Sequence, residues 1–137
     1  MIQSVDSFKL LRVINNAAVK INRTIDCLLQ FHIAEEETKY GFSMNEVREL
    51  ADSDEVSRMG AVRICGVMGM ATFTDNMDQV RNEFRYLTGC YRELKEEFFS
   101  DQDHFREISM GMSGDYTVAI EEGSTIIRIG SIIFGGQ

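Results

Sequence analysis

The sequence predicts an α/β protein with a parallel sheet. Strand-length runs rich in β-branched residues recur along the 137 residues and alternate with segments whose apolar residues are spaced three and four apart, as on a helix. The pattern gives five strands and four helices, and the sequence contains no proline. Such regular alternation is typical of βαβ units, whose strands lie parallel.

The first two strands are expected at residues 1–5 and 24–33. The second run is almost continuously apolar, as in a strand that is covered on both faces. Between the two runs, Asp6 or Ser7 can cap a helix. The apolar face of that helix consists of Phe8, Leu11, Ile14 and Ala18.

The middle of the chain predicts two more helices around a strand at 61–70. Ser43 followed by Glu46 is a capping box for the first helix. Thr74 is expected to cap the second, long helix. Its apolar stripe consists of Met77, Val80, Phe84, Leu87, Tyr91 and Leu94. A coiled coil would give the same spacing, but the stripe lasts under three heptads and lies between strands, so a helix packed on a sheet is favoured.

The last third of the chain reads as strand, helix and strand. An apolar run ends near Ser109, a short helical segment stops at Gly123, and a β-branched run follows at 125–129. Ser113 is placed to cap this helix, so its hydroxyl and the free N–H groups of the next turn should face the end of the last strand. Two such ends side by side make an anion site, most naturally for a phosphate.

Composition excludes several classes of function. The net charge of −8, from 14 basic and 22 acidic residues, argues against a nucleic-acid surface. The three cysteines form no CxxC pair and indicate neither a disulfide framework nor a zinc site. That cysteine pattern makes a reducing cytoplasm the simplest compartment. No uncharged run approaches membrane-spanning length, so no membrane partner is expected. The two histidines lack ligand-spaced companions, and the serines show no GxSxG elbow.

Several separated motifs stand out near the C-terminus: MGMSGD at 110–115, EGST at 122–125, IRIGS at 127–131 and IFG at 133–135. Others lie upstream: IQSVDS at 2–7, QFHI at 30–33, TKYGF at 38–42 and GVMGMA at 66–71. In this order they closely resemble the motifs of the pyridoxal 5′-phosphate (PLP) homeostasis proteins, the YggS or proline synthase co-transcribed family. The resemblance therefore covers essentially the whole chain.

The resemblance implies a fold like the barrel domain of alanine racemase. A complete βα barrel typically needs about 250 residues, so residues 1–137 are expected to form a single domain equivalent to the last five units of a partial TIM-type barrel. Its N-terminal strands would be absent. Such a half-barrel leaves two unpaired edges and an open apolar interior, so a homo-oligomer that covers them is expected.

The resemblance also implies a cofactor site. Arg128 would face the pyridine nitrogen of PLP, and because guanidinium only donates hydrogen bonds, that nitrogen must be an unprotonated acceptor. The proposed binding residues are Gly111, Met112, Ser113, Arg128, Gly130 and Ser131. Four methionines either line the pocket or fill the barrel interior, and core filling is favoured for Met68, Met70, Met110 and Met112.

Lysine is absent where the family needs it. PLP is held as a Schiff base to a lysine, and in this family that lysine lies on the first strand, N-terminal to anything in this sequence. Lys9, Lys20 and Lys95 fall on predicted helices. Lys39 lies in a strand-to-helix loop, near the cofactor by resemblance but not at the Schiff-base position.

The function expected from these features is non-enzymatic PLP binding in vitamin B6 homeostasis, weakened or lost in the absence of the lysine. One alternative is an amino-acid racemase or related PLP enzyme, which needs acid/base groups on both faces of the substrate. The other is a phosphate-binding barrel module without a cofactor.

Overall fold

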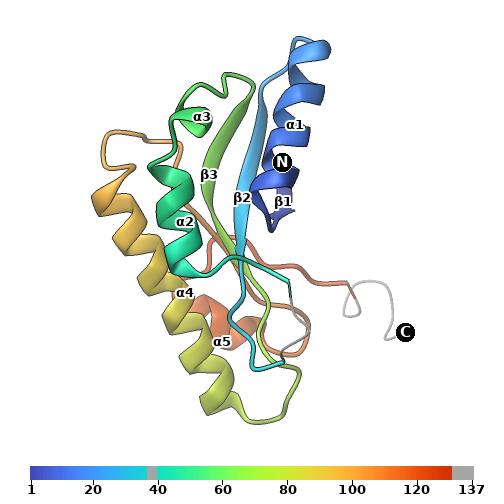
Figure 1. Ribbon diagram of the computed structural model, residues 1–137. Coiled ribbons are helices and arrows are strands. Elements are labelled where there is room, and N and C mark those ends of the chain that lie inside the picture. The colour runs from blue at the N-terminus through green and yellow to red at the C-terminus, as the bar shows by residue number, and fades with distance from the viewer. Residues whose placement is uncertain (37–39, 131–137) are drawn as a thin grey trace.

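The computed structural model describes residues 1–36 and 40–130 (Figure 1). Its strands are β1 (Ile2–Val5), β2 (Ile25–Phe31), β3 (Val62–Gly69) and β4 (Glu107–Ser109), and they form one parallel sheet in the order β1-β2-β3-β4. Its helices are α1 (Phe8–Lys20), α2 (Met44–Ala51), α3 (Asp54–Ser57), α4 (Met77–Glu97) and α5 (Tyr116–Glu121). The α/β class with parallel strands is confirmed. The short helix α3 was not predicted.

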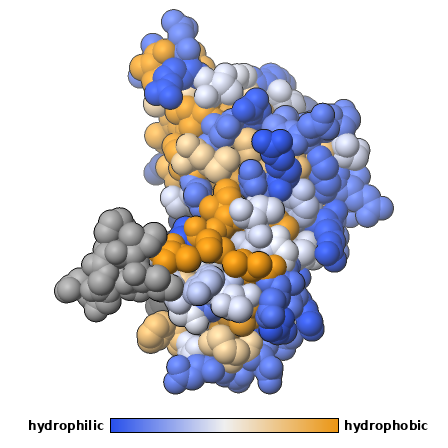
Figure 2. Space-filling model, turned by 180° about the vertical axis from the view of Figure 1, so that it is seen from behind, coloured by the Kyte–Doolittle hydropathy of each residue, from blue (hydrophilic) through white to orange (hydrophobic). Residues whose placement is uncertain are grey.

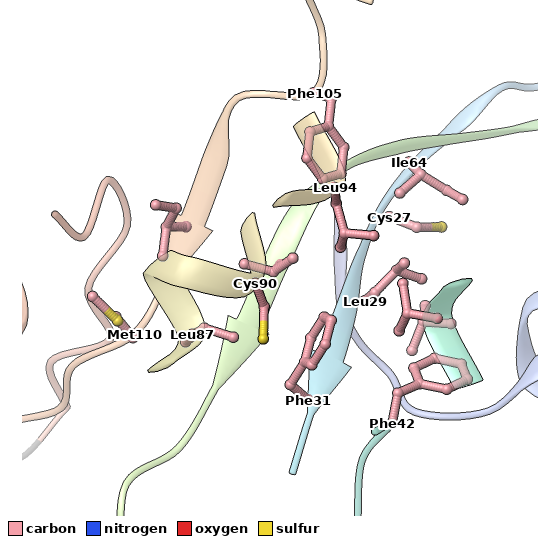
Figure 3. Close-up of a cluster of buried hydrophobic side chains, with 14 of the residues drawn as sticks. Cys27, Leu29, Phe31, Phe42, Ile64, Leu87, Cys90, Leu94, Phe105 and Met110 are labelled. Atoms are coloured by element: carbon pink, nitrogen blue, oxygen red, sulfur yellow. The ribbon is translucent and has the colours of Figure 1, made fainter. Parts of the chain in front are cut away.

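The main core lies between the helices and one face of the sheet. Because the strand order follows the chain and βαβ crossovers are right-handed, successive helices fall on the same face. A single cluster accordingly joins buried residues of α1, α2, α4 and α5 to alternate residues of β2. In Figure 3, Leu87, Cys90 and Leu94 of α4 belong to this cluster together with Leu29 and Phe31 of β2. The stripe on the long helix is therefore sheet packing, as expected.

The opposite face of the sheet carries a smaller hydrophobic cluster, and the sheet curls around this face. Leu28, Cys65 and Met68 are buried there, with Met70 and Ile126 packed against them. The Ser109 hydroxyl of β4 donates to Gln3 Oε1 of β1 over 2.6 Å. In a flat sheet β1 and β4 would lie about 14 Å apart, so side chains of these strands meet only because the sheet bends around this face.

The starts of α1 and α2 follow the expected capping chemistry, whereas the start of α4 does not. Ser7 caps α1 by accepting from the Leu10 N–H over 3.1 Å. Ser43 and Glu46 form the reciprocal capping box of α2. For α4 the expectation of Thr74 is wrong: Asn76 is the N-cap and accepts from the Gln79 N–H. The helix begins two residues later because the Thr74 hydroxyl instead accepts from the Asn76 N–H.

The run at 125–129 is not a regular strand in the described part of the chain. Its only ladder contact is an isolated parallel bridge between Ser109 and Ile126. The hydroxyl of Thr125 accepts from the Ile108 N–H over 2.8 Å, and Ser124 Oγ lies 2.7 Å from the Met110 carbonyl oxygen. These hydroxyls form hydrogen bonds to backbone groups that would otherwise pair with backbone groups of the neighbouring strand. The segment still runs beside β4 without strand geometry.

Candidate functional site

A cleft of about 920 Å³ lies at the carboxyl ends of β3 and β4. One wall is the segment that follows β3, and the other is the segment that follows β4; Arg128 and Gly130 complete the lining. In parallel α/β sheets, ligands bind at the carboxyl ends of the strands. The described lining residues are Met70, Ala71, Thr72, Phe73, Thr74, Asp75, Met77, Met112, Ser113, Gly114, Asp115, Arg128 and Gly130.

Arg128 is the basic residue among the described lining residues. Its backbone N–H donates to the Gly111 carbonyl over 2.9 Å, and its Nη2 donates to the Gly69 carbonyl over 3.0 Å. Its Nε is buried and has no hydrogen-bond partner among the described residues. Burial lowers the pKa of the guanidinium from its usual value, and the charge of Asp115 opposes that shift. The group remains a cation, so the cleft contains a fixed positive charge with an unused donor.

Gly111 supports the backbone of Arg128. Its φ of +106° is a left-handed conformation that favours glycine. A Cβ at this position would lie 2.7 Å from Cβ of Ala119 on α5, so only glycine lets the segment after β4 pass this close to the helix. Gly111 is not itself among the lining residues, and its carbonyl instead fixes the Arg128 backbone.

Residues 112–115 form a turn along the second wall. Asp115 Oδ1 accepts from the Met112 N–H over 2.8 Å, and the Asp115 N–H donates to the Met112 carbonyl. The prediction that Ser113 caps the following helix is wrong, because Asp115 is the N-cap of α5 and makes no side-chain cap bond. The Ser113 hydroxyl has no hydrogen bond to another described residue and lines the cleft.

The methionines divide between core and cleft. Met68 and Met110 are buried, as core filling predicts, and Met70 packs on the smaller cluster while also lining the cleft. Met112 is 47% exposed, so core filling is wrong for this residue and it faces the cleft instead. Gly130 also lines the cleft, whereas Ser131 lies outside the described residues.

Sequence reasoning missed the wall that follows β3. Residues 71–75 carry no motif assigned to a ligand, yet all of them line the cleft. Phe73 is one of them, and its side chain is completely exposed. The adjacent GVMGMA motif at 66–71 was the available signal, because it ends at the first lining residues.

No described lysine lines the cleft. Lys9 and Lys20 lie on α1, and Lys95 of α4 donates to the Gln102 carbonyl over 2.7 Å. Lys39 lies outside the described residues. Residues 1–36 and 40–130 contain no cluster of metal-ligating side chains, and each of their helices is too short or too polar to cross a bilayer. All three cysteines are free.

Comparison with known proteins identifies the family of this chain. The family model described as alanine racemase, N-terminal domain, matches residues 1–137. A pyridoxal phosphate homeostasis protein of Aquifex aeolicus is 36% identical over 98% of this chain and 57% of its own length. Two structures of PipY from Synechococcus elongatus also match. The one without PLP has 30% identity and a TM-score of 0.86 over 97% of this chain and 60% of PipY. The one with PLP bound has 28% identity and a TM-score of 0.80 over 97% of this chain and 59% of PipY.

These relatives are longer than the sequence described here, which spans about three fifths of each. The resemblance to the PLP homeostasis proteins, first noted in the sequence motifs, is confirmed over nearly the entire chain. This protein belongs to the alanine racemase N-terminal domain family.

Proposed function

We propose that this chain binds PLP in the cleft at the ends of β3 and β4 and serves vitamin B6 homeostasis without catalysing a reaction. The observation that carries the proposal is Arg128. The Gly111 carbonyl holds its backbone N–H and the Gly69 carbonyl holds its guanidinium beside the cleft, while its Nε–H has no partner among the described residues. A relative of 28% identity, PipY, has a structure with PLP bound.

The residues present fit this cofactor in type and position. The orphaned donor of Arg128 suits a neutral acceptor such as a pyridine nitrogen, because a guanidinium cannot accept a proton from the ring. The Ser113 hydroxyl, unengaged among the described residues, suits a phosphate oxygen. A Cβ at Gly130 would meet no atom of the described residues within 4 Å, so backbone can approach a phosphate there. Gly111 and Met112 complete the site, Gly111 through Arg128 and Met112 as apolar lining; Ser131 is included from its motif.

PLP supplies an electron-withdrawing ring when bound. A guanidinium at its nitrogen leaves that nitrogen unprotonated, which makes the ring a weak electron sink. Binding and release of the cofactor then suit the site better than carbanion chemistry. The described cleft lining offers Asp75 and Asp115 but no lysine, tyrosine or histidine to act on opposite faces of a substrate.

A racemase-like enzyme is therefore the less supported alternative. A phosphate-binding module without cofactor would use Ser113 and Gly130 but would leave the Arg128 Nε–H without an acceptor. Titration of the chain with PLP and with inorganic phosphate separates these functions. Saturable binding of PLP that is much tighter than that of phosphate supports the proposal, whereas equal affinities favour the phosphate module.

We also propose that residues 1–137 form one domain that corresponds to part of a (βα) barrel. Helices on one face, a strand order that follows the chain and the contact between Gln3 and Ser109 all suit a sheet curling toward closure. β1 pairs only with β2 among the described strands, and an unpaired edge invites another chain.

Self-association of this chain is the arrangement we propose for that edge. Exposed apolar side chains lie close by in sequence, at Met1 and, on or just after α1, at Val13, Val19 and Ile21. Figure 2 shows hydrophobic side chains gathered in a band across the face opposite to that of Figure 1. Sedimentation over a concentration series tests the proposal, and a monomer at every concentration contradicts it.

A further inference from the structure

A carboxylate lies buried behind one wall of the cleft. Glu83, in the second turn of α4, is 9% exposed, and it carries the one charged side chain among the described buried polar residues. Its neighbours on the packed face of the helix, Val80, Phe84 and Leu87, are apolar. Burial of a carboxylate is unfavourable unless donors replace the lost water, so its hydrogen-bond partners indicate its role.

Two of those donors come from one residue of the cleft wall. The Thr72 N–H donates to Glu83 Oε1 and the Thr72 hydroxyl donates to Glu83 Oε2, both over 2.7 Å. Gln79, one turn earlier on α4, donates from Nε2 to Oε2 over 3.2 Å. No lysine or arginine in the described part of the chain forms an ion pair with Glu83. Hydrogen bonds from the loop that Glu83 holds therefore replace most of the water that its carboxylate lost on burial.

The same threonine joins a second loop to this anchor. Its Oγ1 accepts from the Glu35 N–H over 2.9 Å, so the segment after β2 and the segment after β3 are fastened to α4 at one point. Thr72 itself lines the cleft, and the next residue is the fully exposed Phe73. The orientation of Phe73 toward the cleft therefore depends on a backbone that Glu83 fixes from behind.

We infer that Glu83 is a positioning residue of the cleft: it holds the Thr72–Phe73 backbone in the conformation that binds the ligand. This inference rests on the proposed function, in which the ligand is PLP. Without the carboxylate, two described anchors of this loop are left: Thr72 Oγ1 accepts from the Glu35 N–H over 2.9 Å, and the Phe73 N–H donates to Glu36 Oε1 over 3.4 Å. Neither bond joins the loop to α4, so the loop samples conformations in which the wall is displaced. A ligand binds only the competent fraction, so its apparent affinity falls in proportion to that fraction.

The sequence offers a clean probe of this loop. The chain contains no tryptophan, so Phe73→Trp introduces a single indole at a fully exposed position of the wall. In this background we would compare Glu83→Leu and Glu83→Gln. The matched control is Glu93→Leu, on the same helix, where the carboxylate is 57% exposed and pairs with Arg48. The measurements are fluorescence anisotropy decay of the indole, the dissociation constant for PLP and the free energy of unfolding in urea.

For Glu83→Leu we expect faster local rotation of the indole and about tenfold weaker PLP binding, as for a competent fraction reduced to about one tenth. Glu83→Gln should lie between, because its amide oxygen still accepts from the Thr72 N–H while its NH₂ faces the donors at Oε2. Glu93→Leu should leave both quantities unchanged. Should Glu83→Leu fail to fold, the comparison of Glu83→Gln with the parent decides in its place.

The inference is overturned if the Glu83 variants lose only free energy of unfolding while indole rotation and PLP affinity stay as in the parent. It is also overturned if Glu93→Leu gives the same losses. Failure of the parent chain to bind PLP would instead contradict the proposed function, and the indole rotation would still decide whether Glu83 holds the loop.

Discussion

Replacement of Arg128 by alanine tests the candidate site most directly. If the guanidinium meets the ring nitrogen, the variant loses one charge-assisted hydrogen bond to the ligand, worth about 1.5–3 kcal/mol. PLP binding should then weaken by about 10- to 150-fold. The loss of the Nη2 bond to the Gly69 carbonyl is offset by removal of the unpartnered Nε–H, so the free energy of unfolding should change by no more than about 1 kcal/mol.

The assay should separate the ring from the phosphate. Pyridoxine 5′-phosphate avoids reaction of an aldehyde with surface lysines, and an analogue with carbon in place of the ring nitrogen removes only the acceptor. In a cycle of two ligands and two proteins, the Arg128→Ala effect should be large for the nitrogen-containing ring and small for the carbon analogue. Arg106→Ala is the control, because that side chain is 75% exposed and precedes β4, at the end opposite the cleft.

Equal losses for the two rings, or an equal loss for inorganic phosphate, would refute the assignment of Arg128 to the ring nitrogen. Arg128→Lys refines the result. It keeps the charge but not the planar arrangement of donors, so affinity restored by lysine would indicate a general electrostatic role.

Three further predictions follow from the same structure. Borohydride reduction of the PLP complex, read by intact mass and peptide mapping, should yield no specific lysine adduct near full occupancy; such an adduct would contradict the expectation, and Lys39 would be the first residue to examine. In a urea titration, Gly111→Ala should lower the free energy of unfolding by about 1–3 kcal/mol, because the backbone there is left-handed and the new Cβ meets Ala119. Gly114→Ala is the control and should lower it far less, because no described atom lies within 4 Å of a Cβ at that position. Light scattering should give a mass that rises with concentration, and a compact monomer throughout would argue against an open sheet edge.

Elements with a strong local signal were predictable from the sequence. The capping box of Ser43 and Glu46 is a contact within four residues, and the stripe on α4 repeats over five turns, so neither depends on distant neighbours. The parallel sheet could be predicted because strands and helices alternate along the sequence. The position of Arg128 beside a cleft followed from its motif, because Gly111 and Arg128 lie in two signature segments that β4 brings together.

Features that depend on competing partners were not predictable. The run at 125–129 has strand composition, but the hydroxyls of Ser124 and Thr125 bond backbone groups of Met110 and Ile108 and interrupt the ladder. Ser113 has the right residue type for a cap, yet Asp115 begins α5 two residues later. The contact that anchors the cleft wall could not be predicted, because Glu83 lies on α4 and Thr72 lies eleven residues earlier, in the loop after β3.

The hydrogen bond between Ser109 and Gln3 joins residues 106 positions apart. Closing a loop of that length costs about 4 kcal/mol of chain entropy, so this bond cannot form before the intervening units are in place. The contact between Gln3 and Ser109 should therefore not yet be formed in the folding transition state. Replacing Gln3 should speed unfolding while leaving the refolding rate nearly unchanged. The curl that brings the two outer strands together would then be the last event of folding, and the first contact to open when the chain unfolds.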